Sequence, residues 1–182
     1  RIKSFVFEKN SRPSIETGFH AQLGTFVIHT HSIYANLLTC AKEGEDIVKA
    51  LFPNSLWIEY ATPGCELSLA IKNTLRKSRQ KANVFFLQNH GIIVVEQTTQ
   101  AVINLHEKIN KTIRDYFNLN LAVYEEKAVD IIFMKEHILF PDQVVYTLSG
   151  TNILETSAAK ETFWAYEFIL RTIKDLNLTH HY

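Results

Sequence analysis

Apolar residues recur along the chain at two spacings, which predict an alternation of helices and strands. Apolar side chains that return every three or four positions form one face of a helix, as Ile15, Phe19 and Leu23 do. Short runs rich in β-branched and aromatic residues predict strands instead. The predicted helices cover residues 14–23, 32–38, 62–77, 98–119, 125–133 and 157–176, and the predicted strands cover residues 4–7, 25–29, 55–60, 83–87, 91–95 and 143–148.

Polar residues mark the ends of several of these elements. Ser32 is placed to cap the helix that follows it, and Thr62 with Pro63 predicts a helix start, because proline suits the first helical position. The strands at residues 83–87 and 91–95 are close enough to form a hairpin. Helices and strands alternate without the strict period of a βαβ array. We therefore expect one layered α/β domain over residues 1–182, with helices on both sides of a mixed sheet.

Composition and charge exclude several classes of function. Lys+Arg 19 against Asp+Glu 19 leaves no net charge, so no electrostatic footprint for nucleic acid is expected. No apolar run approaches the length that crosses a bilayer and no signal peptide is recognisable, so we expect no membrane partner and a cytoplasmic location. Cys40 and Cys65 stand far apart, which fits a reducing compartment better than a disulfide framework.

The candidate chemistry centres on His29 and His31, at the end of a predicted strand. Side chains at i and i+2 of a strand point to the same face, so these two imidazoles can converge on one metal ion. His90, in the predicted hairpin connection, and Glu16, near a predicted helix start, are the residues that would complete the site. A catalytic zinc site uses three protein ligands and an open position. The spacing alone leaves open a second interpretation, a soluble domain with a paired histidine and no metal.

The other histidines are predicted to be ordinary surface or core residues. They are His106, His137, His180 and His181. His20 shares a helix face with Glu16, and we expect it to make a structural hydrogen bond rather than to bind metal. Gly91 follows His90 directly, and its missing Cβ would let the chain pass close to the site.

Four blocks of the sequence together resemble the class II aldolase/adducin family. They are PSIETGFH at residues 13–20, HTH at 29–31, YATPG at 60–64 and LQNHG at 87–91. Their order and spacing match over about residues 13–110, and a match in several blocks is specific where one block alone would be weak. The PSIET wording and FPDQVVY at residues 140–146 are similar to the aldolase domain of rhamnulose-phosphate aldolase/short-chain dehydrogenase fusions. The fold implied is a three-layer α/β/α arrangement with a central mixed, largely antiparallel sheet.

The resemblance implies a zinc-dependent aldolase of the fuculose-phosphate and rhamnulose-phosphate type, usually a homotetramer. In that family, the histidines matching His29, His31 and His90 hold zinc, or another divalent ion, and the glutamate matching Glu16 is the catalytic acid/base. The metal acts as a Lewis acid and stabilises the enediolate that is left when a ketose or ketose phosphate loses its C–C bond. The partner is therefore a small sugar or sugar phosphate.

A further proton donor in the family is a tyrosine from a neighbouring subunit. Tyr34, Tyr60 and Tyr146 all stay open as candidates for this role.

The chain departs from the family where phosphate is bound. Family aldolases carry Gly-Asn and Ser-Gly phosphate loops ahead of the PS block, and this chain starts too late to contain them. We therefore expect a domain without the family's N-terminal segment. Ile15 also replaces one of two paired serines, so Ser14 is the matching candidate for substrate binding.

Related activities of the same fold form the alternatives. They are a sugar-phosphate epimerase, a dehydratase and a non-catalytic, adducin-like assembly domain. The glutamate at position 16 favours an aldolase or a dehydratase over an epimerase. Intact His29, His31 and His90 argue against a pure assembly role, because a scaffold has no need of such a site.

Overall fold

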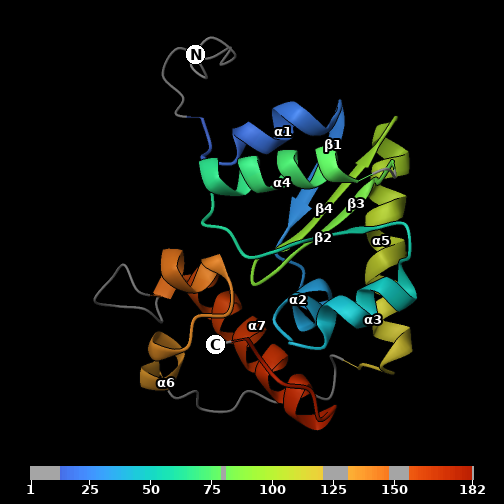
Figure 1. Ribbon diagram of the computed structural model, residues 1–182. Helices are drawn as coiled ribbons and strands as arrows, with labels where there is room; N and C mark the ends of the chain where they lie inside the picture. The colour runs from blue at the N-terminus through green and yellow to red at the C-terminus, as the bar shows by residue number, and fades with distance from the viewer. Residues whose placement is uncertain (1–12, 79–80, 121–130, 148–155, 182) are drawn as a thin grey trace.

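The computed structural model describes residues 13–78, 81–120, 131–147 and 156–181 (Figure 1). In chain order, the elements are α1 (Thr17–Leu23), β1 (Phe26–Thr30), α2 (Ile33–Thr39), α3 (Gly44–Leu51), β2 (Leu56–Ile58), α4 (Cys65–Lys77), β3 (Val84–Leu87), β4 (Gly91–Glu96), α5 (Thr99–Tyr116), α6 (Ile131–Glu136), the π-helix η3 (Gln143–Thr147) and α7 (Ser157–Asp175). The predicted strand at residues 4–7 and most of the predicted helix at residues 125–133 lie outside the described residues.

The sheet has 4 strands in the order β1-β4-β3-β2. β4 pairs antiparallel with both β1 and β3, whereas β2 pairs parallel with β3. The sheet is therefore mixed and largely antiparallel, as the sequence analysis expected. The predicted hairpin is formed by β3 and β4, with Leu87 opposite Gly91.

Helices cover both faces of this sheet, which gives the expected three layers (Figure 1). Alternate residues of a strand point to opposite faces, so β3 divides its side chains between two cores. Phe86 packs with Ile109 and Ile113 of α5 on one face. Phe85 packs with Phe19 of α1 and Leu67 of α4 on the other face.

A third core joins the C-terminal elements to the rest of the molecule. Tyr166 and Ile169 of α7 are buried against Leu37 of α2, and Leu139 and Phe140 complete the same cluster. The cluster connects α2, which follows directly after β1, to the segment that carries η3. In the described part of the chain, no helix has the length and apolar character that crossing a bilayer requires.

Side-chain caps account for several helix starts. Ser32, Thr98 and Thr156 each accept a hydrogen bond from the backbone N–H three residues later, which satisfies one of the free donors of the first turn. The Ser32 cap was predicted. By contrast, the helix expected to start at Pro63 begins at Cys65, after Gly64 in a positive-φ conformation of 108°. The helix Gly44–Leu51 was not predicted at all.

The strand predicted at residues 143–148 is wrong, because Gln143–Thr147 forms a π-helix. The β-branched Val144 and Val145, which favoured a strand, are largely exposed. Gln143 is fully buried instead, and its side-chain oxygen accepts hydrogen bonds from the backbone N–H groups of Leu139 and Phe140. Tertiary hydrogen bonding of this glutamine therefore overrides the local β-propensity.

Candidate metal centre

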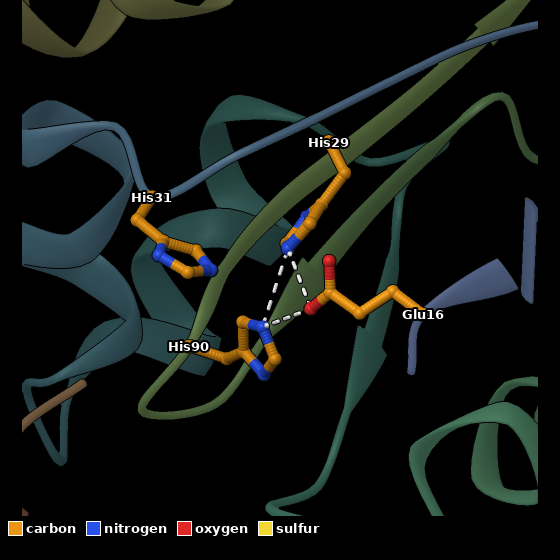
Figure 2. Close-up of side chains that lie close together, drawn as sticks. All are labelled: Glu16, His29, His31 and His90. Atoms are coloured by element: carbon orange, nitrogen blue, oxygen red, sulfur yellow. Dashed lines mark hydrogen bonds and ion pairs between the residues drawn. The ribbon is translucent and has the colours of Figure 1, made fainter. Parts of the chain in front are cut away.

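The four residues singled out from the sequence come together at one end of the sheet (Figure 2). His29 lies near the end of β1, and His31 follows that strand directly. His90 lies in the turn between β3 and β4, and Glu16 is the N-cap residue of α1. Antiparallel pairing of β1 with β4 sets His29 opposite Ile93, which brings the end of β1 beside the turn that carries His90.

Three of the four side chains form a close triangle of potential ligand atoms. His90 Nε2 lies 3.2 Å from Glu16 Oε1, and His29 Nε2 lies 3.4 Å from the same oxygen. The two Nε2 atoms of His29 and His90 are 3.2 Å apart. One atom from each of the four residues, His31 included, lies within 4.8 Å of the others.

These separations fit a tetrahedral metal ion. Two ligand atoms bound to one zinc at about 2.0–2.1 Å lie about 3.3 Å apart, close to all three sides of the triangle. The tautomers fit as well. The Nδ1–H of His29 donates to the carbonyl oxygen of Ile92 at 3.0 Å, so the Nε2 lone pair faces the centre. His31 Nε2 is buried and has no hydrogen-bond partner among the described residues.

The surroundings of His90 and Glu16 favour the protonation states that bind metals. The side chain of His90 is 2% exposed, and this burial lowers the pKa of the imidazole despite the opposing effect of Glu16. The ring nitrogens of His29 and then of His90, close to the carboxylate, hold the pKa of Glu16 well below its usual range. A neutral imidazole and an ionised carboxylate are the ligating forms, so His90 and Glu16 are suited to a cation.

The turn that carries His90 is held from several directions. Asn89 has a φ of 51°, in the left-handed region, and its side chain donates to the carbonyl oxygen of Leu139 at 3.0 Å. Its backbone N–H donates to the carbonyl oxygen of Thr39 at 2.9 Å. Beside it, Gln88 accepts a hydrogen bond from the backbone N–H of Tyr60 at 3.0 Å. The ligand position of His90 therefore depends on contacts to three other segments.

Gly91 allows this turn to approach the end of β1, as the sequence analysis expected. A Cβ built at Gly91 would lie 2.3 Å from the carbonyl oxygen of Thr30 and 3.2 Å from a ring carbon of His31. The first distance is far below van der Waals contact and involves backbone. Any other residue at this position would push the turn and β1 apart.

Other predicted residues lie around the centre without joining it. Ser14 is exposed, and its hydroxyl accepts the backbone N–H of Glu16 at 3.1 Å. The ring of His20 stacks on Phe19 at 4.8 Å, and His20 is not part of the four-residue cluster. His106 accepts or donates a hydrogen bond at 2.7 Å with the hydroxyl of Thr30, on the opposite side of β1.

The three candidate tyrosines are not among the residues that meet at the centre. Tyr34 packs against Phe168 with a ring-centroid distance of 6.1 Å, whereas Tyr60 and Tyr146 are exposed. The predicted role of one of them as a proton donor from a neighbouring subunit stays a prediction.

Sequence reasoning missed one charged residue beside the centre. Asp142 Oδ1 lies 2.9 Å from Nδ1 of His31. The signal was in the chain, since Asp142 belongs to the FPDQVVY block, but that block was used only for its family resemblance. A contact from the C-terminal end of the chain to the turn that carries His90 was also missed. Nδ1 of His181 lies 3.3 Å from the side-chain nitrogen of Gln88.

Comparison with known proteins identifies the family of this fold and site. The family model of the class II aldolase and adducin N-terminal domain matches residues 2–117, so the chain belongs to the class II aldolase/adducin family. The N-terminal class II aldolase domain of a conserved protein from Thermoplasma acidophilum is similar in fold, with a TM-score of 0.53 and 20% identity. That match covers 63% of this chain and 53% of the other, so the chain spans about half the length of that structure.

A second solved structure is more distant. An aldolase II superfamily protein from Pseudomonas syringae gives a TM-score of 0.43 at 13% identity, covering 88% of this chain and 61% of that one. A search among curated proteins gave no match.

Proposed function

We propose that this chain is a zinc-dependent aldolase, a lyase that cleaves a ketose or ketose phosphate by a retro-aldol reaction. The observation that carries the proposal is the convergence of Glu16, His29, His31 and His90 in a chain of the class II aldolase/adducin family. A family member that served only in assembly would not need three histidines and a carboxylate with their ligand atoms turned toward one point.

His29, His31 and His90 are the residues that would hold the ion. Imidazole nitrogens suit zinc, and a site with three such ligands leaves a position for substrate. When bound, the ion supplies a Lewis acid for the carbonyl and hydroxyl oxygens of the sugar. The side chains of His29 and His90 are 6% and 2% exposed, so the low local polarity around them strengthens electrostatic interactions in the site.

Glu16 is the residue that would move the proton. Its side chain is 22% exposed, so the carboxylate is accessible to a substrate. Glu16, ionised at the start, would take the proton of the substrate hydroxyl as the C–C bond breaks and deliver it to the electron-rich carbon that is left. In the reverse reaction it would take the proton from that carbon. The hydroxyl of Ser14, beside the backbone of Glu16, is proposed to contact the substrate.

We also propose that the active form is a homo-oligomer, by analogy with the tetramers of the family. The exposed Tyr60 and Tyr146 could each reach a neighbouring subunit, whereas Tyr34 is committed to its contact with Phe168. The cytoplasmic location stays a prediction.

The test is a retro-aldol assay of the zinc-loaded protein against phosphorylated and unphosphorylated ketoses, with detection of the aldehyde product. Glu16→Gln is expected to retain about one zinc per chain and to lose about 10²–10⁴-fold in kcat. Glu161→Gln, an exposed substitution on α7, is the matched control and should keep full activity.

Three results would contradict the proposal. Full activity of Glu16→Gln would remove its acid/base role, and a folded wild type that binds no divalent metal would remove the metal chemistry. Turnover to an epimer or to a dehydrated product, without aldehyde, would replace the aldolase by one of the related activities of the fold.

A further inference from the structure

His31 differs from the other two histidines of the centre in having a carboxylate behind its ring. Its Nδ1 lies 2.9 Å from Oδ1 of Asp142. An ionised carboxylate this close to Nδ1 favours the tautomer with the imidazole proton on that nitrogen. The Nε2 atom then carries the lone pair, and it is the buried nitrogen without a hydrogen-bond partner in the described part of the chain.

The position of Asp142 is set by the buried residue that follows it. The side chain of Gln143 accepts hydrogen bonds from the backbone N–H groups of Leu139 at 2.7 Å and Phe140 at 3.2 Å. Its amide nitrogen donates to the carbonyl oxygen of Met134 at 3.2 Å. Gln143 is 0% exposed, so these bonds form in a dry environment where they are hard to replace. Asp142 is thus presented from a rigid segment and not from a free surface loop.

We propose that Asp142 is a positioning residue that orients His31 for metal binding. This inference rests on the metal centre of the proposed function and concerns a residue outside the part that the family model covers, residues 2–117. A carboxylate behind a ligating histidine fixes the tautomer and the ring orientation and makes the imidazole a stronger ligand. Loss of such a partner typically costs 10–100-fold in metal affinity.

The three histidines differ in what lies behind the ring. His29 donates to the carbonyl oxygen of Ile92 at 3.0 Å. His31 has the carboxylate of Asp142, and His90 Nδ1 is buried without a partner among the described residues. Asp142 is therefore the one charged group found behind a ligand in the described structure. Its removal should change the centre more than an uncharged contact would.

The surroundings of Asp142 make it suitable for substitution. His31 and Asp142 both border an open cavity of about 500 Å³, and the Asp142 side chain is 28% exposed. Water can therefore replace the carboxylate, so Asp142→Ala and Asp142→Asn should both fold.

The experiment measures zinc affinity of the metal-free protein by competition with a chromophoric chelator. We compare the wild type with Asp142→Asn, Asp142→Ala and the control Asp175→Asn, an exposed substitution at the end of α7. Asp142→Ala is expected to bind zinc about 10–100-fold more weakly. Asp142→Asn should be less severe because its amide oxygen keeps a partial negative charge beside Nδ1, and Asp175→Asn should bind zinc as the wild type does. The melting temperature of each metal-free variant is measured in parallel and should be unchanged.

The visible spectrum of the cobalt-substituted protein gives a second measurement. Its ligand-field bands should shift in Asp142→Ala and stay unchanged in Asp175→Asn, because the geometry of the ligands determines them.

The outcomes separate this inference from the proposed function. A wild type that binds zinc, with equal affinity in all four proteins, overturns the role of Asp142 and leaves the metal centre standing. A fall in zinc affinity that only follows a fall in the melting temperature of the metal-free protein shows a structural role and also overturns it. A wild type that binds no zinc contradicts the proposed function itself.

Discussion

The sheet region, residues 13–120, and the C-terminal region, residues 131–147 and 156–181, contribute to the centre in different ways. The sheet region contains all four residues whose potential ligand atoms meet. The C-terminal region contains Asp142, which contacts the outer nitrogen of His31, and Leu139, whose carbonyl oxygen accepts from Asn89. One region thus supplies the donor atoms, and the other restrains the residues that carry them.

The two regions also differ in the interactions that position these residues. In the sheet region, backbone pairing positions the residues, since the register of β1 with β4 brings His29 beside the turn of His90. In the C-terminal region, the residues are positioned by the hydrogen bonds of the buried Gln143 side chain and by the packing of α7 on α2. The family match ends at residue 117, three residues before the end of the sheet region. The donor set therefore lies within the residues that the family model matches, whereas support for His31 comes from beyond them.

Outside the four residues of the centre, the largest expected effect belongs to a substitution within the sheet region, Gly91→Ala. The new Cβ would meet the carbonyl oxygen of Thr30 at 2.3 Å, so the turn and β1 must separate. We expect a loss of about 1–3 kcal/mol in the free energy of unfolding from this overpacking. Misplacement of His90 by about 1 Å should lower kcat about 10²-fold. Urea unfolding and the retro-aldol assay measure the two effects, and wild-type values for both would show that the close approach is unnecessary.

In the C-terminal region, Gln143→Ala is expected to lower stability by a similar amount but to disturb activity less than Gly91→Ala does. The substitution leaves the N–H groups of Leu139 and Phe140 without their buried acceptor, which should cost about 1–3 kcal/mol in the free energy of unfolding. Zinc affinity should fall as well, because Asp142 loses its rigid support. The control Gln100→Ala, at an exposed position on α5, should stay within about 0.5 kcal/mol of the wild type. If zinc affinity is unaffected while stability falls, the two regions are less coupled than the geometry indicates.

The smallest expected effect is a dependence on pH to which both regions contribute. Burial lowers the pKa of His90 and His106 in the sheet region and of His181 in the C-terminal region below 6.5. The unfolded chain therefore binds more protons than the folded one once the pH falls below about 6.5, so the stability of the metal-free protein must decrease there.

Urea midpoints between about pH 7.5 and about pH 5.5 measure this decrease. His90→Gln and His181→Gln should each reduce the slope, and comparison of the two divides the effect between the regions. A midpoint that stays constant or rises on acidification would contradict the assignment of neutral, buried imidazoles.

Much of the sheet region could be predicted because its signals are local. The cap at Ser32 and the β3–β4 hairpin follow from residues near one another in the chain, and both were found as expected. The start of α4 was misplaced, since the conformation of Gly64 and not Pro63 determines where that helix begins. The helix at Gly44–Leu51 was missed although its first turn contains Glu45 and Asp46, acidic residues that favour a helix start.

The C-terminal region was harder to predict because its decisive contacts are made by buried polar side chains. Val144 and Val145 indicated a strand, but they are exposed in a π-helix that the hydrogen bonds of Gln143 hold in place. A local pattern cannot show that a glutamine will be fully buried and will satisfy backbone groups in a neighbouring turn. For the same reason, the position of Asp142 beside His31 could not be derived from the spacing of residues.

The sequence by itself determined the kinds of donor and their local arrangement. His29 and His31 share a face because side chains alternate along a strand, and His90 lies in a turn because a hairpin connects the strands around it. Only the tertiary structure decided that Glu16 meets His90 across 74 residues at 3.2 Å and that Asp142 contacts His31 at 2.9 Å. These two contacts depend on how the helix layers and the C-terminal region pack on the sheet. The free energy of that packing is spread over many contacts between segments that are distant in the chain.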